Sequence, residues 1–488
     1  MGNQLFRTKN LDLLMQDTEE PQHALKKALG AVDLVALGVG AIIGAGIFVT
    51  IGTAAAGNAD RPGAGPAIIL SFVLVAIACS FSALCYAEFA SMIPISGSAY
   101  TYSYATLGEL VAWIIGWDLI IEYAVGNVAV AIGWSGYLQQ LIGGFGLHIP
   151  DWLAIDYRTG HRSAEILASA PHLFNIPIII NLPAALSVAA ITWVLVIGVK
   201  ESSRFNAVMV ALKILILGIF VIVGFFYVKA EHWTPFAPGG WAGIQTGAAL
   251  IFFAYIGFDA VSTCAEETKN PKRDLPIGMI GSLVICTVIY VAVAVVLTGL
   301  VPYTDLNTAE PLATALAAVH LDKMVGLISL GAVIATTAVL LVFQMGQPRI
   351  FFSMSRDGLL PKVFSKVHPR YRTPHVTTII TGVAVAAFAA FASIDEVVEL
   401  TNIGTLFAFL LVCAGVIILR HKDPHRPRGF RCPWVPWVPL AGIATCIYLM
   451  FGLPTITWIR FGVWLVIGLV LYFAYGFWNS RLRHPQTR

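Results

Sequence analysis

The stretch GVGAIIGAGIF, residues 38–48, is the strongest indication of the fold. It lies at the centre of an apolar run from about Ala31 to Gly57. The run is long enough to cross a bilayer. Glycine weakens a helix by about 1 kcal/mol relative to alanine, and this stretch holds Gly38, Gly40, Gly44 and Gly46. Glycines also expose backbone N–H and C=O groups, which survive at membrane depth only where they line a cavity or meet a ligand. We therefore expect an interrupted helix that forms part of a binding site.

The composition is that of a membrane protein. The 488 residues are 58% hydrophobic and 12% charged, with a mean hydropathy of +0.79, whereas soluble domains carry about 25% charged residues. The apolar spans lie at about residues 31–57, 66–92, 107–138, 176–199, 205–228, 242–265, 275–301, 324–348, 375–393, 398–419, 433–456 and 460–479. This pattern predicts an all-α polytopic membrane protein with 12 transmembrane helices.

Basic residues gather on one side of the predicted membrane. With the N-terminus inside, 23 of the 30 Lys and Arg residues fall in cytoplasmic segments and 6 in outer segments, while Lys213 lies inside a span. The positive-inside rule then places both termini in the cytoplasm, including residues 1–30 and 480–488. The first 30 residues lack the apolar core of a cleavable signal peptide, so the first span is expected to direct insertion into the cell membrane.

The sixth apolar span is interrupted in the same way as the first. GAALIFFAYIGFDAVSTCAEE, residues 247–267, has Gly257 and Asp259 at its centre. The first and sixth spans hold corresponding places in two halves of five spans each. Paired interruptions of this kind indicate a transporter site between inverted repeats. The expected divisions are a first repeat over 31–228, a second repeat over 242–420 and two additional spans over 433–479.

Several longer motifs resemble one known family. They are the opening stretch, CYAEFASMIPISGSAYTYSYATLGE (85–109), GWDLIIEY (116–123), FFAYIGFDAVSTCAEETKNPKRDLPIG (252–278) and SRDGLLPKVF (355–364). They resemble the amino acid–polyamine–organocation superfamily, within its bacterial branch similar to the cationic amino acid transporters. The resemblance implies the leucine-transporter fold, in which two inverted five-helix repeats hold the substrate at breaks in helices 1 and 6. Two further helices would follow at the C-terminus, and a small accessory membrane subunit could be a partner.

The interruptions and the resemblance point to the same backbone groups. Freed N–H groups at a half-helix N-terminus favour a carboxylate, and freed carbonyl groups in the sixth span would accept hydrogen bonds from an ammonium. The family places its side-chain pocket beside the eighth span, where a bulky phenylalanine would limit substrate length. The expected substrate-binding residues are Ile43, Gly44, Ala45, Gly46, Glu122, Phe253, Ala254, Ile256 and Phe343. Helix packing is the alternative interpretation of the glycines, because Gly40 and Gly44 have small-xxx-small spacing.

Lys213 most directly suggests ion coupling. It lies about nine residues into the fifth span without a charged neighbour in sequence. A lysine within the membrane is expensive and is expected to face the bundle interior, although snorkelling to the inner surface is an alternative. In proton-driven members of the family, a lysine on helix 5 stands where sodium-driven relatives hold an ion. We therefore expect Lys213 and Glu122 to be the proton-coupling residues.

These features predict a secondary-active, proton-coupled transporter that moves cationic or neutral L-amino acids across the bilayer by alternating access. Glu122 favours a cationic substrate if it faces the pocket and is ionised, so both substrate classes remain open. An exchanger, a permease for branched-chain or small neutral amino acids, and a sensor without transport are the alternatives. The spans carry no catalytic cluster, metal-ligand spacing or nucleotide motif, so we expect no enzyme, metal or cofactor. The net charge of +3 gives no indication of nucleic-acid binding.

Overall fold

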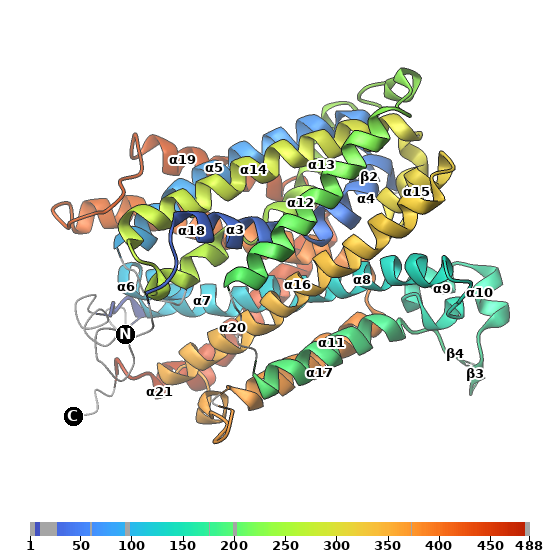
Figure 1. Cartoon of the computed structure of the whole chain (residues 1–488). Coiled ribbons are helices and arrows are strands. Elements are labelled where there is room, and N and C mark those ends of the chain that lie inside the picture. Colours follow the sequence, from blue (N-terminus) through green and yellow to red (C-terminus); the bar gives the residue numbers. More distant parts are fainter. Residues whose placement is uncertain are drawn as a thin grey trace.

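The structure is a computed structural model that describes residues 5–9, 27–58, 61–92, 98–174, 176–198, 203–371 and 373–483 (Figure 1). Within these residues the chain is almost entirely helical, as predicted. Eight of the described helices are long and apolar enough to cross a membrane, and a ninth results if two helices joined at a 40° bend count as one span. Three further apolar helices have 10–17 residues. They coincide with the remaining predicted spans but are short, so the count of twelve crossings stays a prediction.

The membrane-crossing helices have the following bounds. The bent pair is α3 (Ala31–Ile42) and α4 (Ile51–Ala56), joined through the π-helical turn η1 (Gly46–Thr50). The long spans contain α5 (Ile68–Met92), α7 (Glu109–Ile120) with η3 (Ile121–Val125) and α8 (Gly126–Gly143), α12 (Ser203–Phe225), α13 (Gly240–Ile251) with η6 (Phe252–Tyr255), α14 (Pro271–Leu300), α16 (Asp322–Arg356), α18 (Ile394–Lys422) and α20 (Thr455–Leu471). The shorter apolar helices are α11 (Leu182–Ile197), α17 (His375–Phe391) and α19 (Trp437–Met450).

The remaining elements extend these spans or lie between them. The helical ones are η2 (Gly65–Ala67), α6 (Ser98–Thr106), η4 (Asp151–Leu153), α9 (Tyr157–His161), α10 (Ala164–Ser169), η5 (Ala230–Trp233), η7 (Asp259–Glu267), η8 (Tyr303–Leu306), α15 (Pro311–Ala318), η9 (Lys362–Ser365), η10 (Tyr472–Gly476) and α21 (Phe477–Asn479). Two antiparallel hairpins pair β1 (Gly57–Asn58) with β2 (Arg61–Pro62), and β3 (His172–Leu173) with β4 (Ile176–Pro177).

Local sequence explains where several spans begin and end. The side chain of Asn181 accepts a hydrogen bond of 3.2 Å from the N–H of Ala184 and caps the start of α11. Proline stands in the first turn of α11 and of α14, where its missing N–H removes no helical bond. Gly198 ends α11 with a φ of 100°, a conformation that favours glycine.

The helices pack in pairs that are distant in sequence. α5 packs along α14, α8 along α16, and α11 along α17, and Figure 1 shows α5 beside α14 and α11 beside α17. Each pair joins the second, third or fourth span of one predicted half with its counterpart in the other half. Two halves related by a two-fold axis would pack in this way, and this pairing supports the division at 31–228 and 242–420 as a prediction.

Candidate functional site

Both expected interruptions are present in the structure. Helix α3 stops at Ile42, and Ile43 is extended, with φ −73° and ψ 99°. In the sixth span, α13 gives way to the 3₁₀ turn η6, and Gly257 adopts a φ of +116°. The left-handed conformation at Gly257 favours glycine over any residue that carries a Cβ. Gly44, Gly46 and Gly257 therefore lie where the backbone departs from the α-helix, whereas Gly38 and Gly40 lie within α3.

The two interruptions lie against each other. A Cβ added to Gly46 would overlap the backbone of Ala254, and one added to Gly257 would lie 3.0 Å from the carbonyl of Ala41. The predicted sites on the first and sixth spans, 43–46 and 253–256, are thus brought together. Close packing does use these glycines, as the alternative interpretation held, but the packing joins two interrupted backbones rather than two regular helices.

Side chains from neighbouring helices bind the carbonyl groups that the first interruption frees. Lys213 Nζ on α12 donates hydrogen bonds to the carbonyl oxygens of Gly40 at 2.7 Å and Ile43 at 3.0 Å. The hydroxyl of Tyr290 on α14 donates to the carbonyl of Ile42 at 2.9 Å. Lys213 is 1% exposed, so its ammonium faces the bundle interior and does not snorkel to a membrane surface. It lies directly at the helix break.

Glu122 belongs to a group of buried carboxyls. It sits in the π-helical turn η3, is 2% exposed, and lies within interaction range of Asp259 and Asp118. Glu122 Oε2 and both carboxyl oxygens of Asp118 and Asp259 have no hydrogen-bond partner among the described residues. Glu122 is thus close to these acids, whereas the described hydrogen bonds of Lys213, the other predicted coupling residue, go to backbone carbonyls of the first span.

Phe343 lies in an apolar region between the third and eighth spans. Its ring meets that of Tyr123 edge-on, with centroids 5.8 Å apart. A Cβ on Gly126 would lie 3.2 Å from both the Phe343 ring and the methyl group of Thr401. Val339, one turn before Phe343 on α16, lies 2.7 Å from the Cβ position of Gly44. Val339 therefore links the helix that carries Phe343 to the first interruption, and the role of Phe343 in limiting substrate length stays a prediction.

Ion pairs also connect separate elements elsewhere in the described chain. Arg61 in the β1–β2 hairpin pairs with Glu399 on α18 at 2.9 Å. Lys9 pairs with Asp357, just beyond the end of α16. Both pairs join segments that are more than 300 residues apart in sequence.

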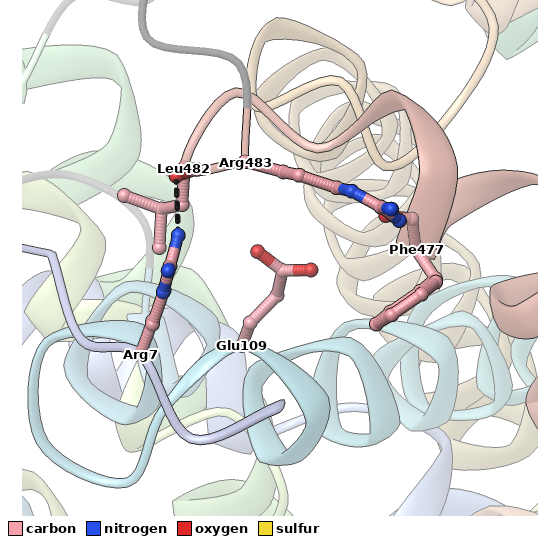
Figure 2. A pocket seen from close by; sticks show the side chains of 5 residues that line it. All are labelled: Arg7, Glu109, Phe477, Leu482 and Arg483. Atoms are coloured by element: carbon pink, nitrogen blue, oxygen red, sulfur yellow. Dashed lines mark hydrogen bonds between the residues drawn. The ribbon is translucent and has the colours of Figure 1, made fainter. Parts of the chain in front are cut away.

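The cavity drawn in Figure 2 is separate from the interrupted helices. Glu109 lies between Arg7, Leu482, Phe477 and Arg483, and Arg7 donates to the carbonyl of Leu482 at 3.3 Å. Glu109 also accepts hydrogen bonds from Tyr104, Tyr472 and Ser480. These bonds tie the two ends of the described chain to α7, and none of the predicted site residues lines this cavity.

The comparisons with known proteins decide the family. The protein-family model with the description "Amino acid permease" matches residues 29–474 of this chain. The chain belongs to this family. Amino acid permeases of this kind form part of the amino acid–polyamine–organocation superfamily, and the relatives below place the chain near the cationic amino acid transporters, as the motifs indicated.

Several relatives match the permease over most of its length. The Methylthioribose transporter of Bacillus subtilis (strain 168) is 47% identical over 98% of this chain and 99% of its own length. The Branched-chain amino acid permease BcaP of the same organism is 47% identical over 99% of this chain and 100% of its own length. "Cationic amino acid transporter 4, vacuolar" of Arabidopsis thaliana is 39% identical over 86% of this chain and 68% of its own length. These names describe transporters and permeases rather than enzymes, and they support amino acid transport by a multi-pass membrane protein.

Three residues at this candidate site of the permease were not predicted from the sequence. Tyr290 and Val339 lie in uniformly apolar spans, where the sequence does not distinguish them from residues that only pack. Asn402 offered a signal, because it stands in the polar run TNIGT (401–405) inside the apolar helix α18. Its side chain contacts the second interruption and is fully buried.

Proposed function

We propose that this permease is a proton-coupled, secondary-active transporter of L-amino acids that works by alternating access in the plasma membrane, with both termini in the cytoplasm. The contact between Gly46 and Ala254 is the main support for this proposal, because it brings two interrupted helices together. The backbone N–H groups of 43–46 would bind the α-carboxylate. The carbonyl groups of Phe253, Ala254 and Ile256 would bind the α-ammonium.

Proton coupling is assigned to Lys213 and Glu122. The charged ammonium of Lys213 holds the carbonyl groups of Gly40 and Ile43, and hydrogen bonds from a charged donor are about twice as strong as neutral ones. Loss of the proton would weaken this hold and free α3 to move. Glu122 would carry a proton within the group it forms with Asp118 and Asp259, because three neighbouring buried carboxyls without a described basic partner cannot all be ionised.

The substrate that the site fits best is a neutral, apolar L-amino acid. Close contacts link Gly126 to Phe343 and Thr401, Phe343 to Tyr123, and Val339 to Gly44, and these residues would line the pocket for the substrate side chain. Glu122 lies close to two other acids, Asp118 and Asp259, which would favour its protonated, uncharged form. The similarity to a branched-chain amino acid permease supports the same class. A cationic substrate is the alternative, supported by the similarity to the plant transporters.

Methylthioribose is a second candidate substrate, supported by the 47% identical Bacillus transporter. This sugar thioether has neither a carboxylate nor an ammonium, so it would leave the polar ends of the interrupted helices without an ionic partner. The small accessory membrane subunit implied by the resemblance remains a prediction.

Reconstituted protein tests the proposal. Proteoliposomes are given an inward proton gradient and offered leucine, lysine or methylthioribose, and counterflow is measured in parallel without a gradient. Leucine uptake driven by the proton gradient supports the proposal. Counterflow without gradient-driven uptake would indicate an exchanger, and ligand binding without either flux would indicate a sensor.

A further inference from the structure

Asn402 binds the backbone where the sixth span changes from α-helix to 3₁₀ helix. Its side chain is 0% exposed, and Nδ2 donates hydrogen bonds to the carbonyl oxygens of Ala249 at 2.8 Å and Leu250 at 2.9 Å. A primary amide has two N–H donors, so one side chain can serve both carbonyls. Asn402 thus connects α18 to the last turn of α13.

These two carbonyl groups are at the point where the helical pattern changes. In an uninterrupted α-helix they would accept hydrogen bonds from the N–H groups of Phe253 and Ala254. The turn η6 instead follows the tighter 3₁₀ pattern from Phe252 onward. Carbonyl groups at such an end need an outside partner, because unpaired buried polar groups are costly. The Asn402 amide is that partner for Ala249, and it adds a second donor to the Leu250 carbonyl, which also accepts a backbone N–H at the end of α13.

The first span contacts the turn that follows these carbonyl groups. Gly46 packs so closely on Ala254 that a Cβ would overlap the Ala254 backbone. Asn402 on α18 therefore binds the backbone just before η6, and Gly46 packs against η6 itself. The two contacts together would restrict the position of the carbonyl groups of Phe253, Ala254 and Ile256.

Neighbouring residues on α18 serve different parts of the site. The methyl group of Thr401 faces Gly126 in the apolar region near Phe343, while Asn402 binds the sixth span. Substitution of Asn402 should therefore affect the end of the substrate that all amino acids share, rather than the pocket for the variable side chain.

We propose that Asn402 is a positioning residue that holds the turn η6 so that its carbonyl groups bind the α-ammonium of the substrate. The inference rests on the proposed function. It predicts that Asn402 determines how strongly the protein prefers an amino acid over the same carboxylic acid without its amino group.

Binding of leucine and of 4-methylpentanoate, which is leucine without the amino group, tests this role. Dissociation constants are measured by titration of the purified full chain. Asn402→Leu keeps the size of the side chain and removes both donors, and Asn402→Ala is measured alongside. Asn127→Ala is the matched control, because Asn127 is equally buried but donates to Gln344 at 2.7 Å.

In the Asn402 variants we expect leucine to bind about 10-fold more weakly, while binding of 4-methylpentanoate changes little. The preference for leucine should persist in Asn127→Ala. Equal weakening of both ligands, or an unchanged preference in a variant that melts like wild type, would overturn the inference. If Asn402→Ala does not fold, Asn402→Leu decides by the same criteria. Absence of leucine binding to the wild-type protein would instead contradict the proposed function.

Discussion

The Lys213 ammonium lies 3.0 Å from the carbonyl oxygen of Ile43, at the residue where the first span leaves the α-helix. A second bond, to Gly40, places the same ammonium across the end of α3. A buried side chain on α12 therefore binds the end of a half-helix that would bind substrate. This arrangement connects a group that can exchange a proton with the part of the backbone that would recognise the carboxylate.

Lys213→Ala should abolish leucine uptake driven by a proton gradient while leucine binding remains measurable. The reason is that the substitution removes the charged donor at the helix break and leaves the N–H groups of 43–46 in place. Uptake into proteoliposomes and equilibrium binding are the two measurements. Lys229→Ala, which changes a lysine outside the site, should retain both activities. Gradient-driven uptake at the wild-type rate in Lys213→Ala would exclude this lysine as the coupling group.

Gly46→Ala should destabilise the protein by about 1–3 kcal/mol, because the added methyl group overlaps the backbone of Ala254. All amino acids should bind more weakly, since the two interrupted segments are forced apart. Thermal unfolding and a binding panel measure the two effects. Gly218→Ala is the matched control, because no neighbouring atom lies within 4 Å of its Cβ position on α12. A Gly46→Ala protein that binds leucine normally would show that the contact is not needed.

Phe343→Ala should enlarge the space beside Gly126 and shift selectivity toward longer side chains. Leucine should lose affinity, because a cavity replaces the aromatic ring, whereas phenylalanine or methionine should lose less or gain. Competition with a panel of amino acids measures the shift. Phe388→Ala, on a side chain that is 65% exposed on α17, should leave selectivity unchanged. Uniform changes across the panel would place Phe343 outside the side-chain pocket.

Glu122→Gln should reduce proton-driven uptake and leave counterflow of leucine largely intact. Its position beside Asp118 and Asp259 assigns Glu122 to proton transfer rather than to the substrate side chain. Lysine and leucine binding, measured together by thermal stabilisation, separate the two roles. Selective loss of lysine binding would show instead that Glu122 recognises a cationic side chain.

The interruptions and the buried position of Lys213 could be predicted, because membrane helices seldom carry several glycines at mid-span or an isolated charge. Each of these features can be recognised from its own position in the sequence, without knowledge of how the helices pack. The π-helical turn at Glu122 could not be predicted, because no glycine or proline marks it. The partners Tyr290 and Asn402 could not be assigned either, since each binds backbone on a helix more than 150 residues away. Such contacts depend on how the helices pack.

Coupled movement of leucine and protons can be measured directly in reconstituted vesicles. Proteoliposomes containing a pH-sensitive dye are placed in leucine without an imposed pH gradient, and internal pH is followed with leucine uptake. Proton-coupled transport predicts that leucine entry acidifies the interior and that Lys213→Ala abolishes the acidification. Leucine entry at an unchanged internal pH would contradict it.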